Sequence, residues 1–314
     1  MIENHGEWAV SCENISKTYN PDIQALKNID LKVSPHQIFG IIGPDGAGKT
    51  TLFRILTTLI LADEGKATVL GYDVVDDYQE IRKYVGYMPG RFSLYQDLSV
   101  EENLKFFASV FGTTVEENYD LIKNIYQQIE PFKNRRAGQL SGGMKQKLAL
   151  SCALIHKPKL LILDEPTTGV DPVSRKEFWE MLQNLKNEGI TILVSTAYMD
   201  EAGLCDTIAL ILNGKFLKID TPQNIVQQFE PAIYSVQSNQ RSKLLNDLRS
   251  LPQVSSCYAF GESIHVTVEN EKISKEELQN YLLKSGHEQI EVAKIAPTVE
   301  DCFMELSKQQ EQNN

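Results

Sequence analysis

A glycine-rich segment near the start of the chain has the residue types that bind phosphate. It matches the pattern GxxxxGK[ST] in full, and with the next residue it comprises Gly43, Pro44, Asp45, Gly46, Ala47, Gly48, Lys49, Thr50 and Thr51. Backbone N–H groups of such a loop point at phosphate oxygens, the lysine reaches the outer phosphates, and the hydroxyl of Thr50 binds Mg²⁺. The segment therefore predicts a site for a nucleotide and its Mg²⁺ ion.

The residues on either side of this loop indicate a strand before it and a helix after it. Ile38–Ile42 is a nearly continuous apolar run of the kind found in strands buried on both faces. After Thr50 the apolar residues follow helical spacing and share one face: Leu52, Ile55, Leu56, Leu59 and Ile60. A phosphate-binding loop needs this order of elements, because the helix start adds its own N–H groups to the site.

Two adjacent carboxylates, Asp164 and Glu165, follow the apolar strand Leu160–Leu163. An open α/β sheet binds its ligands at the carboxyl ends of its strands. Phosphoryl transfer requires a group that holds Mg²⁺ and a second group that orients or deprotonates water. We expect Asp164 to do the first and Glu165 the second. The alternative, a solvated acidic strand end, is weakened by the phosphate-binding loop upstream.

The composition excludes several classes of protein. The net charge of −11 and the pI of about 5.1 argue against a nucleic-acid-binding protein. The sequence has no apolar stretch near the 18–20 residues that a bilayer span needs, and its N-terminus lacks the pattern of a secretion signal, so we expect a cytoplasmic location. Five scattered cysteines, without a CxxC pair, predict reduced and mostly buried thiols.

The order of the expected elements favours an α/β fold with a second, smaller module. Strands at Leu160–Leu163, Thr191–Ser195 and Ile208–Leu212 alternate with a helix that begins at Asp171-Pro172, which predicts a largely parallel sheet. After residue 230 the pattern becomes β-α-β-β-α-β, as in a ferredoxin-like module, and includes a Ser274/Glu277 capping box. We expect a main domain at 1–228 with a helical subdomain at about 91–156, an α+β module at 229–307 and a disordered tail at 308–314.

One further motif gives the sequence a family resemblance. Leu140-Ser141-Gly142-Gly143-Met144-Lys145-Gln146 lies between the phosphate-binding loop and LLILDEP. In this order the motifs resemble the ABC ATPase family, from residue 8 to about 228. The resemblance implies the P-loop NTPase fold of an ABC cassette, a mixed and largely parallel sheet with a helical subdomain. It also names the nucleotide as ATP.

The resemblance implies roles for several residues. In such proteins two ATPase domains pair head to tail, and Ser141, Gly142 and Gly143 of one domain face the γ-phosphate bound to the other. Tyr19 lies where an aromatic ring stacks on adenine, and Asp171 lies in the loop that crosses between the subunits. Ser141, Gly142 and Gly143 are here called the signature residues. The N–H groups at the helix start beside Ser141 can bind a second anion.

The chain departs from the family at two positions of the ATP site. Gly90 stands where the family has a glutamine that positions Mg²⁺ and water, and Ala197 stands where it has a histidine that bonds the γ-phosphate. Losing such positioning groups slows the chemical step by roughly 10²–10³-fold. We therefore hypothesise that the site binds MgATP but hydrolyses it slowly, in a heterodimer with a second ATPase subunit. A slow homodimer is the alternative, and the chain retains Glu165, which a site without turnover need not keep.

The resemblance also suggests partners and a location. The segment GPDGAGKTT, together with Ala197 in place of the histidine, is similar to the N-terminal cassette of tandem-cassette multidrug exporters. This implies ABC-2-type permease subunits, a periplasmic adaptor as a further candidate, and a position on the inner face of the membrane through the permeases. DNA-repair ATPases of the superfamily carry a long coiled coil, for which the interval from Lys49 to Ser141 is too short. An ATP-gated structural subunit without turnover remains the alternative function.

Overall fold

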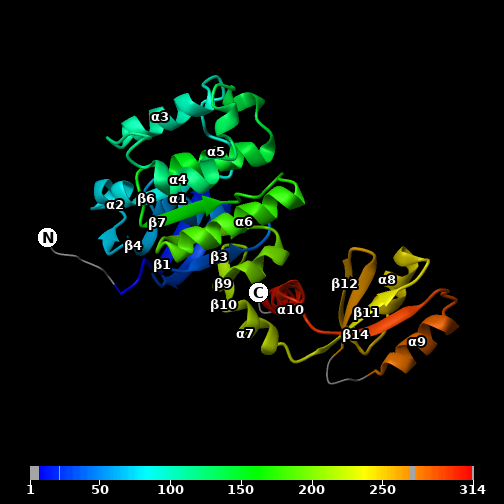
Figure 1. Ribbon diagram of the computed structural model, residues 1–314. Helices are drawn as coiled ribbons and strands as arrows, with labels where there is room; N and C mark the ends of the chain where they lie inside the picture. The colour runs from blue at the N-terminus through cyan, green and yellow to red at the C-terminus, as the bar shows by residue number, and fades with distance from the viewer. Residues whose placement is uncertain (1–6, 21, 269–272, 313–314) are drawn as a thin grey trace. The chain divides into compact units, whose positions relative to one another are not determined.

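The computed structural model of the chain describes residues 7–20, 22–268 and 273–312. They form two compact units, which are Met1–Thr221 and Pro222–Asn314 (Figure 1). The division falls before α7 (Pro222–Gln227), slightly earlier than the expected boundary at 228. The reason is that α7 packs against α10 (Val299–Gln312) of the second unit.

A six-stranded sheet forms the centre of the first unit. Its strand order is β10-β9-β3-β8-β7-β6, and every neighbouring pair is parallel except β10 with β9. Its strands are β3 (Ile38–Ile42), β6 (Val85–Met88), β7 (Leu160–Asp164), β8 (Thr191–Thr196), β9 (Thr207–Leu212) and β10 (Lys215–Asp220). The expected mixed, largely parallel sheet is confirmed. Since β3 and β7 both pair with β8, their carboxyl ends lie at one edge of the sheet.

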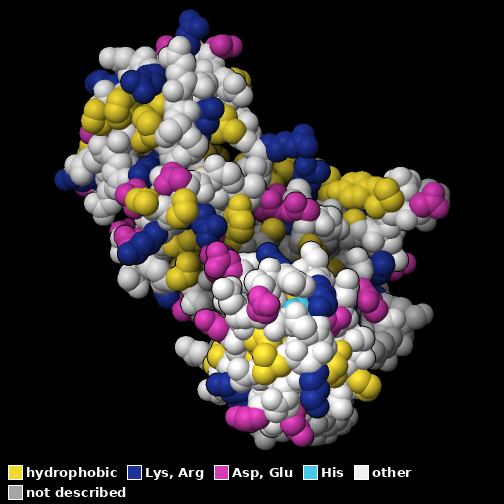
Figure 2. All heavy atoms as spheres, turned by 90° about the vertical axis from the view of Figure 1, so that its right-hand side faces the viewer, with side chains coloured by type: hydrophobic (Ala, Val, Ile, Leu, Met, Phe, Trp, Pro, Cys, Tyr) yellow, Lys and Arg dark blue, Asp and Glu magenta, His cyan; other side chains and the backbone are white. Residues whose placement is uncertain are grey.

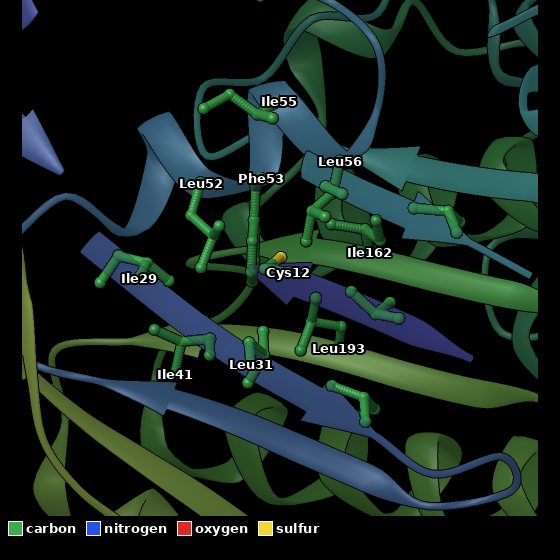
Figure 3. Packing of buried hydrophobic residues seen from close by; sticks show 14 of the residues in the cluster. Cys12, Ile29, Leu31, Ile41, Leu52, Phe53, Ile55, Leu56, Ile162 and Leu193 are labelled. Atoms are coloured by element: carbon green, nitrogen blue, oxygen red, sulfur yellow. The ribbon is translucent and has the colours of Figure 1, made fainter. Parts of the chain in front are cut away.

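A second sheet of the first unit is antiparallel, with the order β2-β1-β4-β5. Its strands are β1 (Val10–Asn20), β2 (Ile23–Val33), β4 (Glu64–Val69) and β5 (Tyr72–Asp73). Helix α1 (Lys49–Leu56) shares one hydrophobic core with strands of both sheets. Figure 3 shows Leu52, Phe53 and Leu56 pointing from this helix toward the strands. The helix that follows the glycine-rich loop is therefore fixed by packing.

The segment at about 91–156, where we expected a helical subdomain, is rich in helices. Its helices are α3 (Val100–Val110), α4 (Tyr119–Tyr126), the 3₁₀ turns η1 (Glu130–Phe132) and η2 (Ala137–Gln139), and α5 (Gly142–Leu154). The remaining helices of the unit are α2 (Tyr78–Tyr84), α6 (Pro172–Asn187) and the 3₁₀ turn η3 (Met199–Leu204). Helix α6 begins as expected, because the Asp171 side chain accepts from the N–H groups of Val173 and Ser174.

The prediction that Leu59 continues the apolar face of the first helix is wrong. Helix α1 ends at Leu56, and the side chain of Leu59 is 54% exposed. The Thr57 hydroxyl donates to the carbonyl of Phe53 at 2.8 Å, and Thr58 adopts a φ of 60°. This left-handed residue turns the chain out of the helix.

The second unit contains an antiparallel sheet of order β12-β13-β11-β14. Its elements are β11 (Ala232–Gln237), α8 (Arg241–Arg249), β12 (Val254–Phe260), β13 (Ser263–Val268), α9 (Lys275–Lys284) and β14 (Glu291–Ile295), together with α7 and α10. The predicted order β-α-β-β-α-β and the capping box of Ser274 and Glu277 are confirmed.

The prediction of a disordered tail from residue 308 is wrong for residues 308–312, which continue helix α10. A polar composition favoured disorder there. However, the Lys308 ammonium group donates to the carbonyl of Ser255, and the Ser307 hydroxyl donates to that of Phe303. Residues 313 and 314 lie outside the described part of the chain.

All five cysteines are free and buried, as predicted, and burial raises the pKa of Cys12 to about 12. Within the described residues, no helix has both the length and the apolar character that a membrane span requires. Basic and acidic side chains are interspersed over the face drawn in Figure 2.

Candidate nucleotide site

The glycine-rich loop lies between β3 and α1, where tight backbone packing requires its glycines. Gly46 and Gly48 have φ values of 77° and 109°, a left-handed region that glycine adopts without strain. A Cβ atom on Gly43 would lie 2.2 Å from the carbonyl oxygen of Ile211. The N–H group of Gly43 donates to the carbonyl of Thr196 at 3.2 Å. The loop is thus anchored to the ends of β8 and β9.

Lys49 is the first residue of α1, and its side chain is only 3% exposed. Its ammonium group donates to the carbonyls of Gly43 at 2.7 Å and Pro44 at 3.0 Å, and lies 3.1 Å from Oε1 of Glu165. Helix α1 has no side-chain cap, so its first N–H groups remain available to an anion, beside Thr50 and Thr51. The lysine and the helix start therefore direct positive charge at the loop.

The two predicted carboxylates lie at the carboxyl end of β7. Asp164 is buried, and its Oδ1 accepts from the hydroxyl of Ser195 at 2.7 Å. Glu165 has a φ of 49°, which is uncommon for a residue with a side chain. Its N–H group is bonded to the carbonyl of Ser195 at 3.1 Å and to the same hydroxyl at 3.0 Å. The fold therefore brings Lys49 and Glu165 together, as expected for a phosphate site with a carboxylate beside it.

The SGG segment forms the start of α5. Ser141 is the N-cap, and its hydroxyl accepts from the N–H group of Met144 at 3.3 Å. Gly142 and Gly143 are the first two residues of the helix. Their N–H groups belong to the unsatisfied set at a helix start, which together with the helix dipole favours an anion.

Both signature glycines also pack closely against the start of α6. A Cβ atom on Gly143 would lie 2.7 Å from the hydroxyl of Ser174, and one on Gly142 would lie 3.3 Å from the carbonyl oxygen of Gly169. Asp171, the N-cap of α6, lies between these two contact points in the sequence. A side chain at either glycine would push the two helix starts apart.

Comparisons with known proteins give this set of motifs a family. Residues 26–168 match the family described as ABC transporter. The chain is 31% identical to the Nod factor export ATP-binding protein I of Rhizobium sp. (strain N33) over 303 residues, covering 95% of this chain and 97% of that protein. The chain belongs to the ABC transporter family. It is an ABC ATPase, and its nucleotide is ATP.

Two further comparisons agree with this assignment. The chain is 38% identical over 289 residues to the probable multidrug ABC transporter ATP-binding protein YbhF of Escherichia coli (strain K12). The match covers 91% of this chain. It spans 49% of YbhF, about half its length. The chain also resembles the dimeric ATP-binding cassette MJ0796 bound to ADP and Pi, with a TM-score of 0.62, 26% identity and coverage of 68% of this chain and 98% of that one.

Gly90 and Ala197, which have no polar side chain, lie beside the site. A Cβ atom on Gly90 would lie 3.1 Å from the carbonyl oxygen of Asp164 and 3.6 Å from its Oδ2. Position 90 therefore adjoins the Asp164 carboxylate. Ala197 directly follows β8, next to Thr196, whose carbonyl bonds Gly43 of the loop.

Tyr19 lies on β1 at the side of the loop. Its hydroxyl is 3.3 Å from that of Thr51, and the residue is 50% exposed. Part of this aromatic residue is therefore open to solvent beside the phosphate-binding loop. Its role in stacking on adenine stays a prediction of the family resemblance.

Sequence reasoning missed a polar cluster that links α6 to the segment after β8. The guanidinium of Arg175 lies 2.6 Å from Oδ2 of Asp200 and 3.4 Å from Oε1 of Glu201, and its Cζ is 4.5 Å from the Tyr198 ring centroid. The same Oε1 accepts from the hydroxyl of Thr167 at 2.8 Å. Because these residues are distant in sequence, only the fold reveals the cluster. It holds the segment containing Ala197 against the start of α6.

Proposed function

We propose that this chain is the ATP-binding, energising subunit of an ABC exporter and that ATP drives its pairing with a second ATPase subunit. The observation that carries the proposal is the convergence of Lys49 and Glu165 in one site, with the SGG segment at the start of another helix. Each ATP would lie between the loop of one subunit and the SGG segment of the other. The chain's similarity to a Nod factor export ATP-binding protein supports export.

Lys49 and the N–H groups of the loop bind the phosphates, and Tyr19 stacks on the base. Thr50 and Asp164 supply hydroxyl and carboxylate oxygens, the ligands that Mg²⁺ prefers, and would hold this ion. Bound Mg²⁺ neutralises charge on the phosphates. Glu165 orients the attacking water and accepts its proton. Its Oε2 lies 3.4 Å from the Thr168 hydroxyl and its Oε1 lies beside Lys49, which fixes its direction.

We further propose that this site retains MgATP longer than an intact site would. Position 90 adjoins the carboxylate of Asp164, yet Gly90 has no group that positions water, and Ala197 has none that bonds a phosphate. The groups that bind ATP remain. The intact Ser141, Gly142 and Gly143 would complete a competent site on a non-identical partner. A homodimer with slow turnover is the alternative assembly.

A groove near Gly90 supports docking of a membrane subunit. It has a volume of about 460 Å³ and is lined mainly by apolar and aromatic side chains, among them Pro89, Phe92, Phe107, Val110 and Phe111. A short helix with an apolar face, from an ABC-2-type permease, would fit such a groove. The ATPase would then lie on the inner face of the membrane through its permeases.

The experiment is an ATPase assay of the purified chain with and without a candidate second ATPase subunit. We expect slow hydrolysis by the chain alone and faster hydrolysis by the pair. In the pair, Glu165→Gln on this chain should reduce turnover little, whereas loss of the signature serine by Ser141→Ala should reduce it strongly. Rapid hydrolysis by the chain alone would contradict the asymmetric assembly.

The same assay distinguishes the alternative function, an ATP-gated structural subunit without turnover. Gly90 and Ala197 favour this alternative, whereas the retained Glu165 opposes it. Association with the second subunit that depends on ATP, without any hydrolysis at either site, would support the structural subunit.

A further inference from the structure

Ser195 lies directly beside Asp164 because of the strand register. In the parallel pairing of β7 with β8, the partner of Asp164 is Ser195. Both residues are buried, and Ser195 has no exposed surface. A hydroxyl in this position must find its hydrogen-bond partners within the protein, because water does not reach it.

The Ser195 hydroxyl bonds to both residues of the acidic pair. It donates to Oδ1 of Asp164 at 2.7 Å and accepts from the N–H group of Glu165 at 3.0 Å. A backbone N–H can only donate, so the single hydroxyl proton is directed to Asp164. The bond to a carboxylate is charge-assisted and stronger than a neutral one. One hydroxyl therefore orients the Asp164 carboxylate and holds the backbone of Glu165.

The backbone of Glu165 needs such support. Its φ of 49° costs free energy for a residue with a Cβ atom and persists only where surrounding contacts fix it. Position 90, which adjoins the other side of Asp164, is a glycine and contributes no side-chain bond. The next residue of β8, Thr196, bonds Gly43 of the phosphate-binding loop. The end of β8 thus connects the acidic pair to the loop.

We propose that Ser195 is a positioning residue for the metal-nucleotide site: it orients Asp164 toward Mg²⁺ and sets the direction of Glu165. Ser195 acts through these two residues and does not itself contact ATP or Mg²⁺. This inference rests on the proposed Mg²⁺-dependent ATP site. It assigns to Ser195 part of the positioning that a side chain at position 90 would otherwise supply.

The test is the Mg²⁺ dependence of nucleotide binding by the purified chain, measured with a fluorescent ATP analogue. Removing a group that orients a metal ligand typically costs about 10–100-fold in metal affinity. We expect Ser195→Ala to raise the Mg²⁺ concentration for half-maximal binding by about tenfold or more. Binding of the analogue in EDTA should change by less than about twofold, because Lys49 and the loop remain.

Two control variants separate positioning from general damage. Ser195→Thr keeps the hydroxyl and should restore most of the Mg²⁺ dependence. Ser151→Ala removes another fully buried hydroxyl, which donates to the Lys147 carbonyl within α5, and should leave the Mg²⁺ dependence unchanged. Equal weakening of binding with and without Mg²⁺ in Ser195→Ala would overturn the proposal. So would an unchanged Mg²⁺ dependence, or wild-type binding that does not depend on Mg²⁺.

This test uses binding only. Rapid hydrolysis by the chain alone would contradict the asymmetric assembly and leave the Mg²⁺ result standing.

Discussion

The ammonium group of Lys49 lies 3.1 Å from the carboxylate of Glu165. The lysine side chain is 3% exposed and that of the glutamate 22%, so the pair is largely shielded from solvent. The two residues are distant in sequence, and the pairing of β3 and β7 with β8 brings them together. The phosphate-binding group and the carboxylate proposed to direct water therefore belong to one site.

The Lys49–Glu165 pair predicts opposite outcomes for two substitutions. Lys49→Ala removes a charge-assisted bond to phosphate and should weaken ATP binding by about 10–100-fold. Glu165→Gln removes a negative charge near the phosphates, so binding should stay equal or tighten. Titration of each variant with ATP and Mg²⁺ measures this. Equal loss of affinity in both variants would contradict the arrangement.

The packing of the signature helix against α6 predicts an effect on stability. A Cβ atom on Gly143 would lie 2.7 Å from the hydroxyl of Ser174 and 2.9 Å from its Cβ. Gly143→Ala should therefore lower the free energy of unfolding by about 1–3 kcal/mol. Urea unfolding of the variant measures the change.

A matched glycine serves as the control for this prediction. A Cβ atom on Gly203 would meet nothing within 4 Å, so Gly203→Ala should change the free energy of unfolding by less than about 0.5 kcal/mol. Adding Ser174→Gly to Gly143→Ala should recover part of the loss. If the double variant is less stable than the sum of the single changes predicts, the close contact is not the cause.

We expect the buried ring of His156 to lower the free energy of unfolding at low pH. Burial lowers its pKa to about 4, from an ordinary value of 6.5, and its ring stacks on Phe111 at 3.8 Å. Between pH 6.5 and pH 4 the unfolded chain binds a proton that the folded chain does not, so stability falls as the pH falls. The contribution should be about 1–2 kcal/mol between pH 7 and pH 5. Urea unfolding at these two pH values measures the effect. The free energy of unfolding should decrease less from pH 7 to pH 5 in His156→Gln than in the wild type. The same loss in both would rule out His156 as the source.

The parts of the fold that depend on local sequence were predictable. The glycine-rich loop and the start of α6 at Asp171 follow from residue types at short spacing, and both are confirmed. The prediction that Leu59 lies on the first helix was wrong, because spacing alone does not reveal where a helix ends. Here the end depends on Thr58 in a left-handed conformation. The bond from Ser195 to Asp164 depends on the register between two strands and had no local signal.

The tail after residue 307 illustrates a similar limit. Composition predicted disorder, but the ammonium group of Lys308 reaches the carbonyl of Ser255, a contact far away in sequence. Such a contact stabilises the last turns of α10 in a way that a polar sequence does not predict.

We propose above that Gly90 and Ala197 make a site that binds ATP well and hydrolyses it slowly. The most direct test of this proposal compares the kcat and the ATP affinity of the purified chain with those of the double variant Gly90→Gln/Ala197→His. The new glutamine would adjoin Asp164, where a Cβ atom at 3.1 Å from the carbonyl oxygen needs only a small adjustment.

We predict that kcat rises by about 10²-fold or more in the double variant, that ATP affinity stays within about threefold, and that adding Glu165→Gln removes the gain. Rapid hydrolysis by the wild-type chain alone, unaffected by the double substitution and lost on Glu165→Gln, would contradict the claim.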